Sequence, residues 1–145
     1  AGVPPVWAEP KDRVISVPTE DEAMNAAMAK ARASLDRFWA AKDSPKADEE
    51  GFALKVRIED DGQSEHFWLT DVKRDGGKLS GSINNDPQWV GNVKMGQRYE
   101  FKEADVSDWM FMRKGRIVGN ETLRVLLGHM PAAEAAQYKR MLENP

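Results

Sequence analysis

The chain has 145 residues, 41% of them hydrophobic and 31% charged, and a formal net charge of −3. This length suits one domain, and the absence of cysteine excludes disulfides, thiolate metal sites and cysteine nucleophiles. Lys and Arg are interspersed with Asp and Glu, and no apolar run approaches the ~18 residues of a membrane span, so the composition predicts neither nucleic-acid binding nor membrane insertion.

Residues 1–18 are rich in proline and do not begin with methionine. Such a start is typical of a chain whose signal peptide has been removed, or of a start altered by cloning. We therefore expect an extended N-terminal segment over 1–18 and a single domain over 19–145. We also expect an exported protein, periplasmic or secreted, with a cytoplasmic location as the alternative.

A helix is predicted to begin at Thr19, because Thr19 and Glu22 have the spacing of a capping box. It should end near Lys42, before Ser44-Pro45. Between these two points, apolar residues recur at three- and four-residue spacing and should form one buried face of an amphipathic helix: Ala23, Met24, Ala27, Met28, Ala31, Leu35, Phe38 and Trp39.

Residues 52–58 alternate apolar and charged side chains, the period of a strand with one wet face. Turn residues at 60–62, 75–77, 95–96 and 114–115 separate further short apolar segments. We expect those strands at 64–72, 78–84, 89–93, 98–101, 107–112 and 116–118. Connections this short favour antiparallel pairing, and the strand containing Trp109 should be buried on both faces.

Asn120 is a candidate N-cap for a short helix that stops at Gly128, and Pro131 can open a final helix. The predicted fold class is therefore α+β: an N-terminal amphipathic helix, a strongly bent antiparallel β-meander and a C-terminal helix pair.

Four blocks follow one another with little between them: EHFWLTDV, SINNDP, VKMGQRYEF and SDWMFMRKGRIVGNETLR. Together they resemble the YegJ-like family, small bacterial proteins grouped as a domain of unknown function, and the resemblance covers about residues 20 to 143. It places six candidate ligand-binding residues near the blocks that define the family: Trp68, Asn84, Asn85, Gln97, Asp108 and Arg124. Each also has a local explanation, the asparagines and Gln97 in turns and Arg124 in a salt bridge to Asp108 or Asp105.

The candidate chemistry is limited. His66 and His129 are the only histidines, so we predict no metal site and no cofactor. On a strand, Glu65 and His66 point to opposite faces. A nucleophile would need Ser107 or Ser80 beside His66, and Ser107-Asp108 is more typical of a turn. The basic hairpin tip at 113–116 suits either an anion or plain solvation.

The function best supported by these residues is a non-catalytic binding or interaction module that uses a concave, aromatic-lined face of the sheet. Its partner would be an unidentified protein or small ligand, with the oligomeric state left open. The first alternative is a cysteine-free hydrolase working through carboxylates and His66. The second is a structural subunit that associates with itself.

Overall fold

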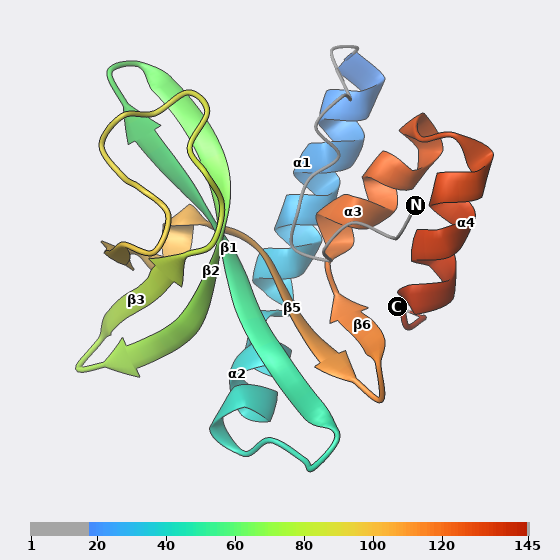
Figure 1. The fold of residues 1–145 in the computed structure, drawn as a ribbon, viewed down its shortest axis with the longest axis horizontal. Coiled ribbons are helices and arrows are strands. Elements are labelled where there is room, and N and C mark those ends of the chain that lie inside the picture. The colour runs from blue at the N-terminus through green and yellow to red at the C-terminus, as the bar shows by residue number, and fades with distance from the viewer. Residues whose placement is uncertain (1–17, 145) are drawn as a thin grey trace.

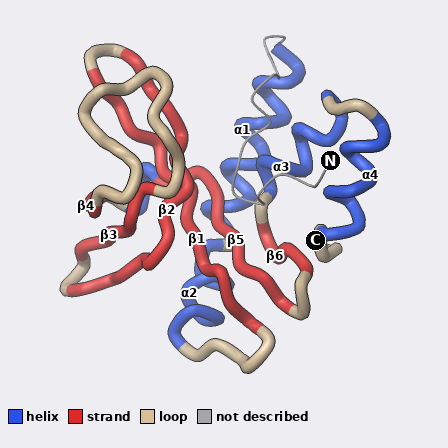
Figure 2. Tube along the Cα trace, viewed as in Figure 1, coloured by secondary structure: helices blue, strands red, loops and turns tan. Residues whose placement is uncertain are grey.

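The computed structural model describes residues 18–144, with side chains described from residue 22 onward. The chain forms helices at both ends and an antiparallel sheet between them (Figures 1 and 2). In chain order the elements are α1 (Pro18–Ala33), α2 (Leu35–Asp43), β1 (Glu49–Asp60), β2 (Gln63–Asp75), β3 (Lys78–Ile83), β4 (Arg98–Phe101), β5 (Val106–Arg113), β6 (Arg116–Gly119), α3 (Glu121–Leu126) and α4 (Ala132–Met141), with 3-10 turns at Glu103–Asp105 and Leu127–His129.

The six strands lie in the order β4-β3-β2-β1-β5-β6, and every neighbouring pair is antiparallel. This meander between an N-terminal helical segment and C-terminal helices confirms the predicted α+β class. The long strands β1 and β2 curve through the molecule, with β3 and β4 to one side and β5 and β6 to the other (Figure 1). Among the described residues, no helix has the length and apolar character needed to cross a membrane.

The central part of the sheet is covered on both faces. Leu54, Val56 and Ile58 of β1 pack in a core that includes residues of α1 and α2. Ala53 packs in a second, smaller core with Trp68 and residues of the C-terminal helical segment. The alternation predicted for residues 52–58 is therefore present in β1. Lys55, on the face expected to be exposed to solvent, is nevertheless only 5% exposed.

The predicted single helix to Lys42 is interrupted at Ser34. The Ser34 hydroxyl donates to the Lys30 carbonyl oxygen at 2.8 Å, and the Trp109 indole donates to the Ala31 carbonyl oxygen at 3.1 Å. That carbonyl would otherwise accept from Leu35 in a continuous helix. The contact with Trp109 therefore favours a break in the helix at Ser34, where the apolar periodicity of the sequence alone predicted a continuous helix. The predicted capping box depends on the Thr19 side chain, which lies outside the described side chains.

The strand predicted at residues 89–93 is wrong. Residues 84–97 form one irregular segment between β3 and β4, called the 84–97 loop below. Val90 and Val93 are buried at 5% and 7% exposure, so their apolar character reflects anchoring of a loop rather than strand alternation. Pro87 and the glycines at 91 and 96 interrupt regular pairing throughout the segment.

Candidate functional site

Asp108 is an interior carboxylate that caps a helix from a neighbouring strand. It is 0% exposed. Its Oδ1 accepts from the amide of Glu121 at 3.1 Å, and its Oδ2 accepts from the Thr122 amide at 2.9 Å and the Thr122 hydroxyl at 2.6 Å. Asn120, predicted to cap this helix, has a left-handed backbone with φ of 54° and makes no side-chain capping bond. Asp108 therefore satisfies the first amides of α3 that Asn120 was expected to serve.

Lys55 extends this contact into a buried polar network. Its Nζ donates to the Thr122 hydroxyl oxygen at 3.0 Å and lies 5.4 Å from the centroid of a Trp68 ring. Burial raises the pKa of the Asp108 carboxyl, while the nearby Lys55 charge and the hydrogen bonds from Thr122 oppose that rise. The network joins β1, β5 and α3 through one lysine, one carboxylate and one hydroxyl.

Ser107 and His66 are brought together by the fold. His66 Nδ1 lies 2.9 Å from the Ser107 hydroxyl oxygen, which is 3.4 Å from the Lys55 carbonyl oxygen. The pairing of β1 with β5 shifts register between Lys55 and Val56, and Ser107 lies opposite that irregularity. Ser107 is 2% exposed, and its contact with His66 joins β5 to β2.

The structure brings three of the six candidate residues together, since the Trp68 backbone bonds to both Asn84 and Asn85. Trp68 and Asp108 are interior, at 2% and 0% exposure. The Asn85 side chain accepts from the Trp68 amide at 2.7 Å, which extends the pairing along β2. Arg124 donates to the carbonyl oxygens of Gly119 and Glu143, at 3.1 and 2.7 Å.

The salt bridge expected between Arg124 and Asp108 or Asp105 does not form. The carboxylate nearest to the guanidinium is that of Glu121, at 3.9 Å. Asn84 donates its amide to the Trp68 carbonyl oxygen, and the Gln97 side chain accepts from the Lys94 amide at 3.1 Å. All six residues thus make hydrogen bonds within the protein, several of them to residues far away in the chain, and their role in ligand binding stays a prediction.

The 84–97 loop is held to the β1–β2 hairpin by two carboxylates. Glu65 Oε1 accepts from the amide of Trp89 at 2.8 Å and also from those of Gln88 and Val90, at 3.1 and 3.3 Å. Asp60 Oδ2 accepts from the Gly91 amide at 2.9 Å. Figure 1 shows the loop beside the tip of this hairpin. Charge-assisted bonds to consecutive amides fix the loop backbone in one conformation.

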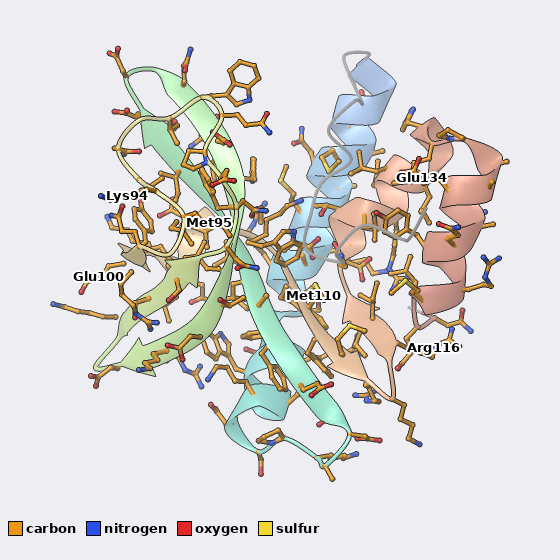
Figure 3. All side chains as sticks on the ribbon, viewed as in Figure 1. Lys94, Met95, Glu100, Met110, Arg116 and Glu134 are labelled. Atoms are coloured by element: carbon orange, nitrogen blue, oxygen red, sulfur yellow. The ribbon has the colours of Figure 1, made fainter. Side chains whose placement is uncertain are left out.

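Two large hydrophobic side chains are exposed among the described residues, and both belong to this loop: Trp89 at 66% and Met95 at 54%. Met95 and Lys94 lie on the opposite side of the molecule from Arg116 and Glu134 (Figure 3). Sequence reasoning placed Trp89 in a strand and left it out of the candidate site. The dense turn residues of the SINNDP block and its surroundings are the signal that pointed to a loop instead.

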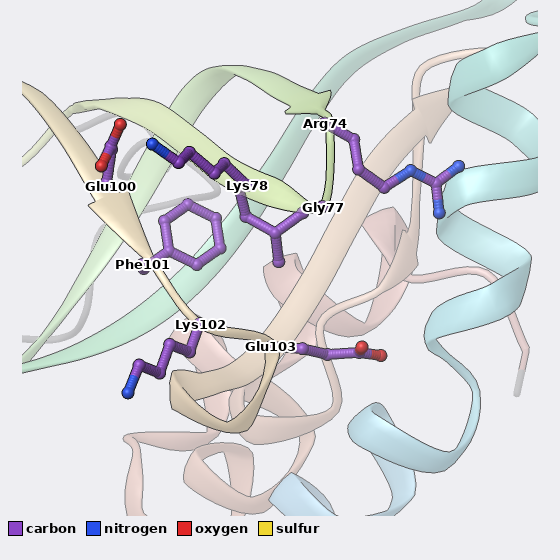
Figure 4. Close-up of a pocket in the computed structure, with 8 residues that line it drawn as sticks. Arg74, Gly77, Lys78, Glu100, Phe101, Lys102 and Glu103 are labelled. Atoms are coloured by element: carbon purple, nitrogen blue, oxygen red, sulfur yellow. The ribbon is translucent and has the colours of Figure 1, made fainter.

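A hollow with a volume of about 570 Å³ lies at the β3–β4 edge (Figure 4). Its lining mixes charges of both signs, including Lys78, Lys102, Glu100 and Glu103. Arg74, at one side, pairs with Asp43 at 2.8 Å and stacks 4.2 Å from a Trp39 ring centroid. These charged groups do not converge on a common point in the hollow, so it supports no specific ligand.

No group of three His, Asp or Glu side chains suited to a metal ion occurs in the part of the chain that the structure describes. The 84–97 loop has its backbone amides held by carboxylates and exposes one indole.

The chain belongs to a recognised class of bacterial proteins. A family model described as "Uncharacterized protein conserved in bacteria (DUF2314)" matches residues 21–143, and the chain belongs to this family. The chain is 38% identical over 136 residues to "Uncharacterized protein YegJ" of Escherichia coli (strain K12), covering 94% of this chain and 88% of that protein.

A second relative is longer. The chain is 31% identical over 134 residues to the "Putative ankyrin repeat protein NMB1133/NMB1171" of Neisseria meningitidis serogroup B (strain ATCC BAA-335 / MC58), covering 81% of this chain and 50% of that protein. No solved structure matches the chain.

Proposed function

We propose that the protein is a non-catalytic binding module whose contact surface is the 84–97 loop and the adjoining tip of the β1–β2 hairpin, residues 59–63. This region is called the Trp89 surface below. The observation that carries the proposal is an indole 66% exposed on a backbone segment whose amides are held by Glu65. We place the contact there rather than on the concave aromatic face expected from sequence, because Trp68 and Trp109 are buried.

Rigidity is what distinguishes Trp89 from an ordinary exposed apolar side chain. Single exposed hydrophobics are common on protein surfaces and need no explanation. Here Val90 and Val93 anchor the loop in the core, and Glu65 and Asp60 hold its backbone. A loop already ordered before binding loses little conformational entropy on association, and tryptophan is the residue type most enriched at binding hot spots.

Trp89→Ala should reduce capture of a partner about 30-fold or more, the loss expected when a hot-spot residue worth ~2 kcal/mol is truncated. The measurement is affinity capture from native lysate with quantitative mass spectrometry, using immobilised wild type and variants of matched thermal stability. Because Trp89 is mostly exposed, its removal should change the unfolding free energy by less than about 0.5 kcal/mol.

Two further variants separate the competing functions. Arg140→Ala changes an exposed residue of α4 and should leave capture unchanged. His66→Ala should also retain it, because the neighbouring Glu65, which holds the loop amides, points to the opposite face of the strand and keeps those bonds. Loss of capture in folded His66→Ala, with capture intact in Trp89→Ala, would favour the histidine-based hydrolase. Capture of a second copy of the chain would favour the self-associating subunit.

A further inference from the structure

We propose that the partner recognised by the Trp89 surface presents lysine or arginine side chains, an inference that rests on the proposed binding function. The hairpin tip and the loop together concentrate acidic residues. Residues 57–65 and 84–97 carry five acidic and two basic side chains: Glu59, Asp60, Asp61, Glu65 and Asp86 against Arg57 and Lys94.

Internal contacts use some of these charges and leave others facing outward. Glu59 pairs with Arg57, and Glu65 is occupied by loop amides. Asp61 and Asp86 are exposed, one at the turn of the hairpin and one in the loop three residues before Trp89. A hydrogen bond to an amide leaves the formal charge of a carboxylate in place, so Asp60 and Glu65 still contribute negative potential around the indole.

The indole and the carboxylates favour the same kind of group. The face of a tryptophan ring attracts the ammonium group of a lysine or the guanidinium group of an arginine. The protein uses this contact within its own fold, where the Arg74 guanidinium lies 4.2 Å from a Trp39 ring centroid beside the Asp43 carboxylate. Trp89 with Asp61 and Asp86 offers an intermolecular partner the same combination of a ring and negative charge.

A negatively charged partner would be repelled by this surface. A polyanion would bring like charge against the five carboxylates of the tip and loop, which disfavours its approach. An uncharged partner would use the exposed indole and Met95 but gain nothing from the acidic rim. A cationic segment of a protein is therefore the occupant that satisfies both features.

The test uses a hexa-arginine peptide as the probe, with hexa-glutamate as the opposite-charge control. Binding is followed by calorimetry and by two-dimensional NMR of the backbone amides and the Trp89 indole N–H. Hexa-arginine should shift the signals of residues 88–90 and the Trp89 indole. Its affinity should fall at least about tenfold when salt is raised from about 50 to about 500 mM, because exposed charges are screened.

Matched charge variants separate local recognition from general attraction. Asp61→Asn with Asp86→Asn should weaken hexa-arginine binding about tenfold or more, and Trp89→Ala should weaken it as well. Asp75→Asn with Glu103→Gln removes the same charge from exposed positions at the β2–β3 turn and the 3-10 turn, and should have less than a twofold effect.

Equal weakening by both double variants, shifts centred outside the Trp89 surface, or equal binding of hexa-glutamate would each overturn the cationic-partner inference. The proposed binding function is judged separately, by the capture experiment with wild type and Trp89→Ala. Capture that depends on Trp89, together with no hexa-arginine binding, would remove this inference and leave the binding module standing.

Discussion

Trp109→Ala should lower the free energy of unfolding by about 3–5 kcal/mol, the range for truncating a fully buried large side chain. Trp109 is 0% exposed, stacks on Phe111 with ring centroids 5.9 Å apart and contacts Phe38 at 6.2 Å. Its indole also donates to the Ala31 carbonyl oxygen and the Ser34 hydroxyl, each at 3.1 Å. Alanine would leave a cavity between β5 and the helices and remove both of these bonds.

Urea melts of Trp109→Ala and wild type, followed by circular dichroism, measure this change. Trp89→Ala serves as the matched control, since it removes the same side chain from an exposed position. Trp109→Phe keeps a ring but loses the indole donor, and should fall between wild type and alanine. A loss below about 1 kcal/mol for Trp109→Ala would contradict the packing described for β5.

Asp108→Ala should cost a similar amount, about 3–5 kcal/mol, because it breaks a buried charge network on one side. The variant removes the acceptor for the Glu121 and Thr122 amides at the start of α3. It also leaves Lys55, at 5% exposure, without the carboxylate whose charge lies beside it. Loss of that negative charge beside the buried ammonium group adds to the loss of the helix cap.

A double variant distinguishes the network from simple loss of packing. Asp108→Ala combined with Lys55→Met should be more stable than Asp108→Ala alone, because no buried charge is left unpaired. Asp75→Ala, in an exposed turn, is the control and should change stability by less than about 0.5 kcal/mol. Additive losses from Asp108→Ala and Lys55→Met would contradict the coupling between these two residues.

Much of the fold was predictable because its causes are local. Alternation over residues 52–58 and the Asp60-Asp61-Gly62 turn determine the first hairpin, and in the structure Asp61 and Gly62 both have positive φ, at 50° and 80°. Gly119 shows a tighter requirement, with φ of +83° and a position where a Cβ would lie 2.5 Å from the Trp109 carbonyl oxygen. Such positions make glycine necessary for close packing of β6 on β5.

The errors share a different cause, contact between residues far apart in the chain. The break at Ser34 depends on Trp109, and the cap of α3 comes from Asp108 on another strand instead of the adjacent Asn120. Likewise, the strand predicted at 89–93 ignored Glu65, whose carboxylate captures the loop amides. Local propensity has no access to these partners, so it favoured regular structure at each position.

The candidate site was predicted less well than the fold. The SINNDP and VKMGQRYEF blocks contain most of the 84–97 loop, and from them the resemblance selected polar residues such as Asn85 and Gln97, which make bonds that shape the loop. Trp89 lies between these two blocks, and its exposed indole was not selected. Tertiary packing decides whether a tryptophan is exposed or buried, and one sequence does not reveal that packing.

The most direct measurement of the central claim is photocrosslinking in living cells from a benzoylphenylalanine that replaces Trp89. The same photoreactive residue in place of Arg140, exposed on α4, is the control. We expect a discrete adduct from position 89 and none from position 140. Excess wild-type protein should suppress this adduct, and excess Trp89→Ala should not. No adduct from position 89, or an equal adduct from position 140, would contradict the assignment of the Trp89 surface as the binding site.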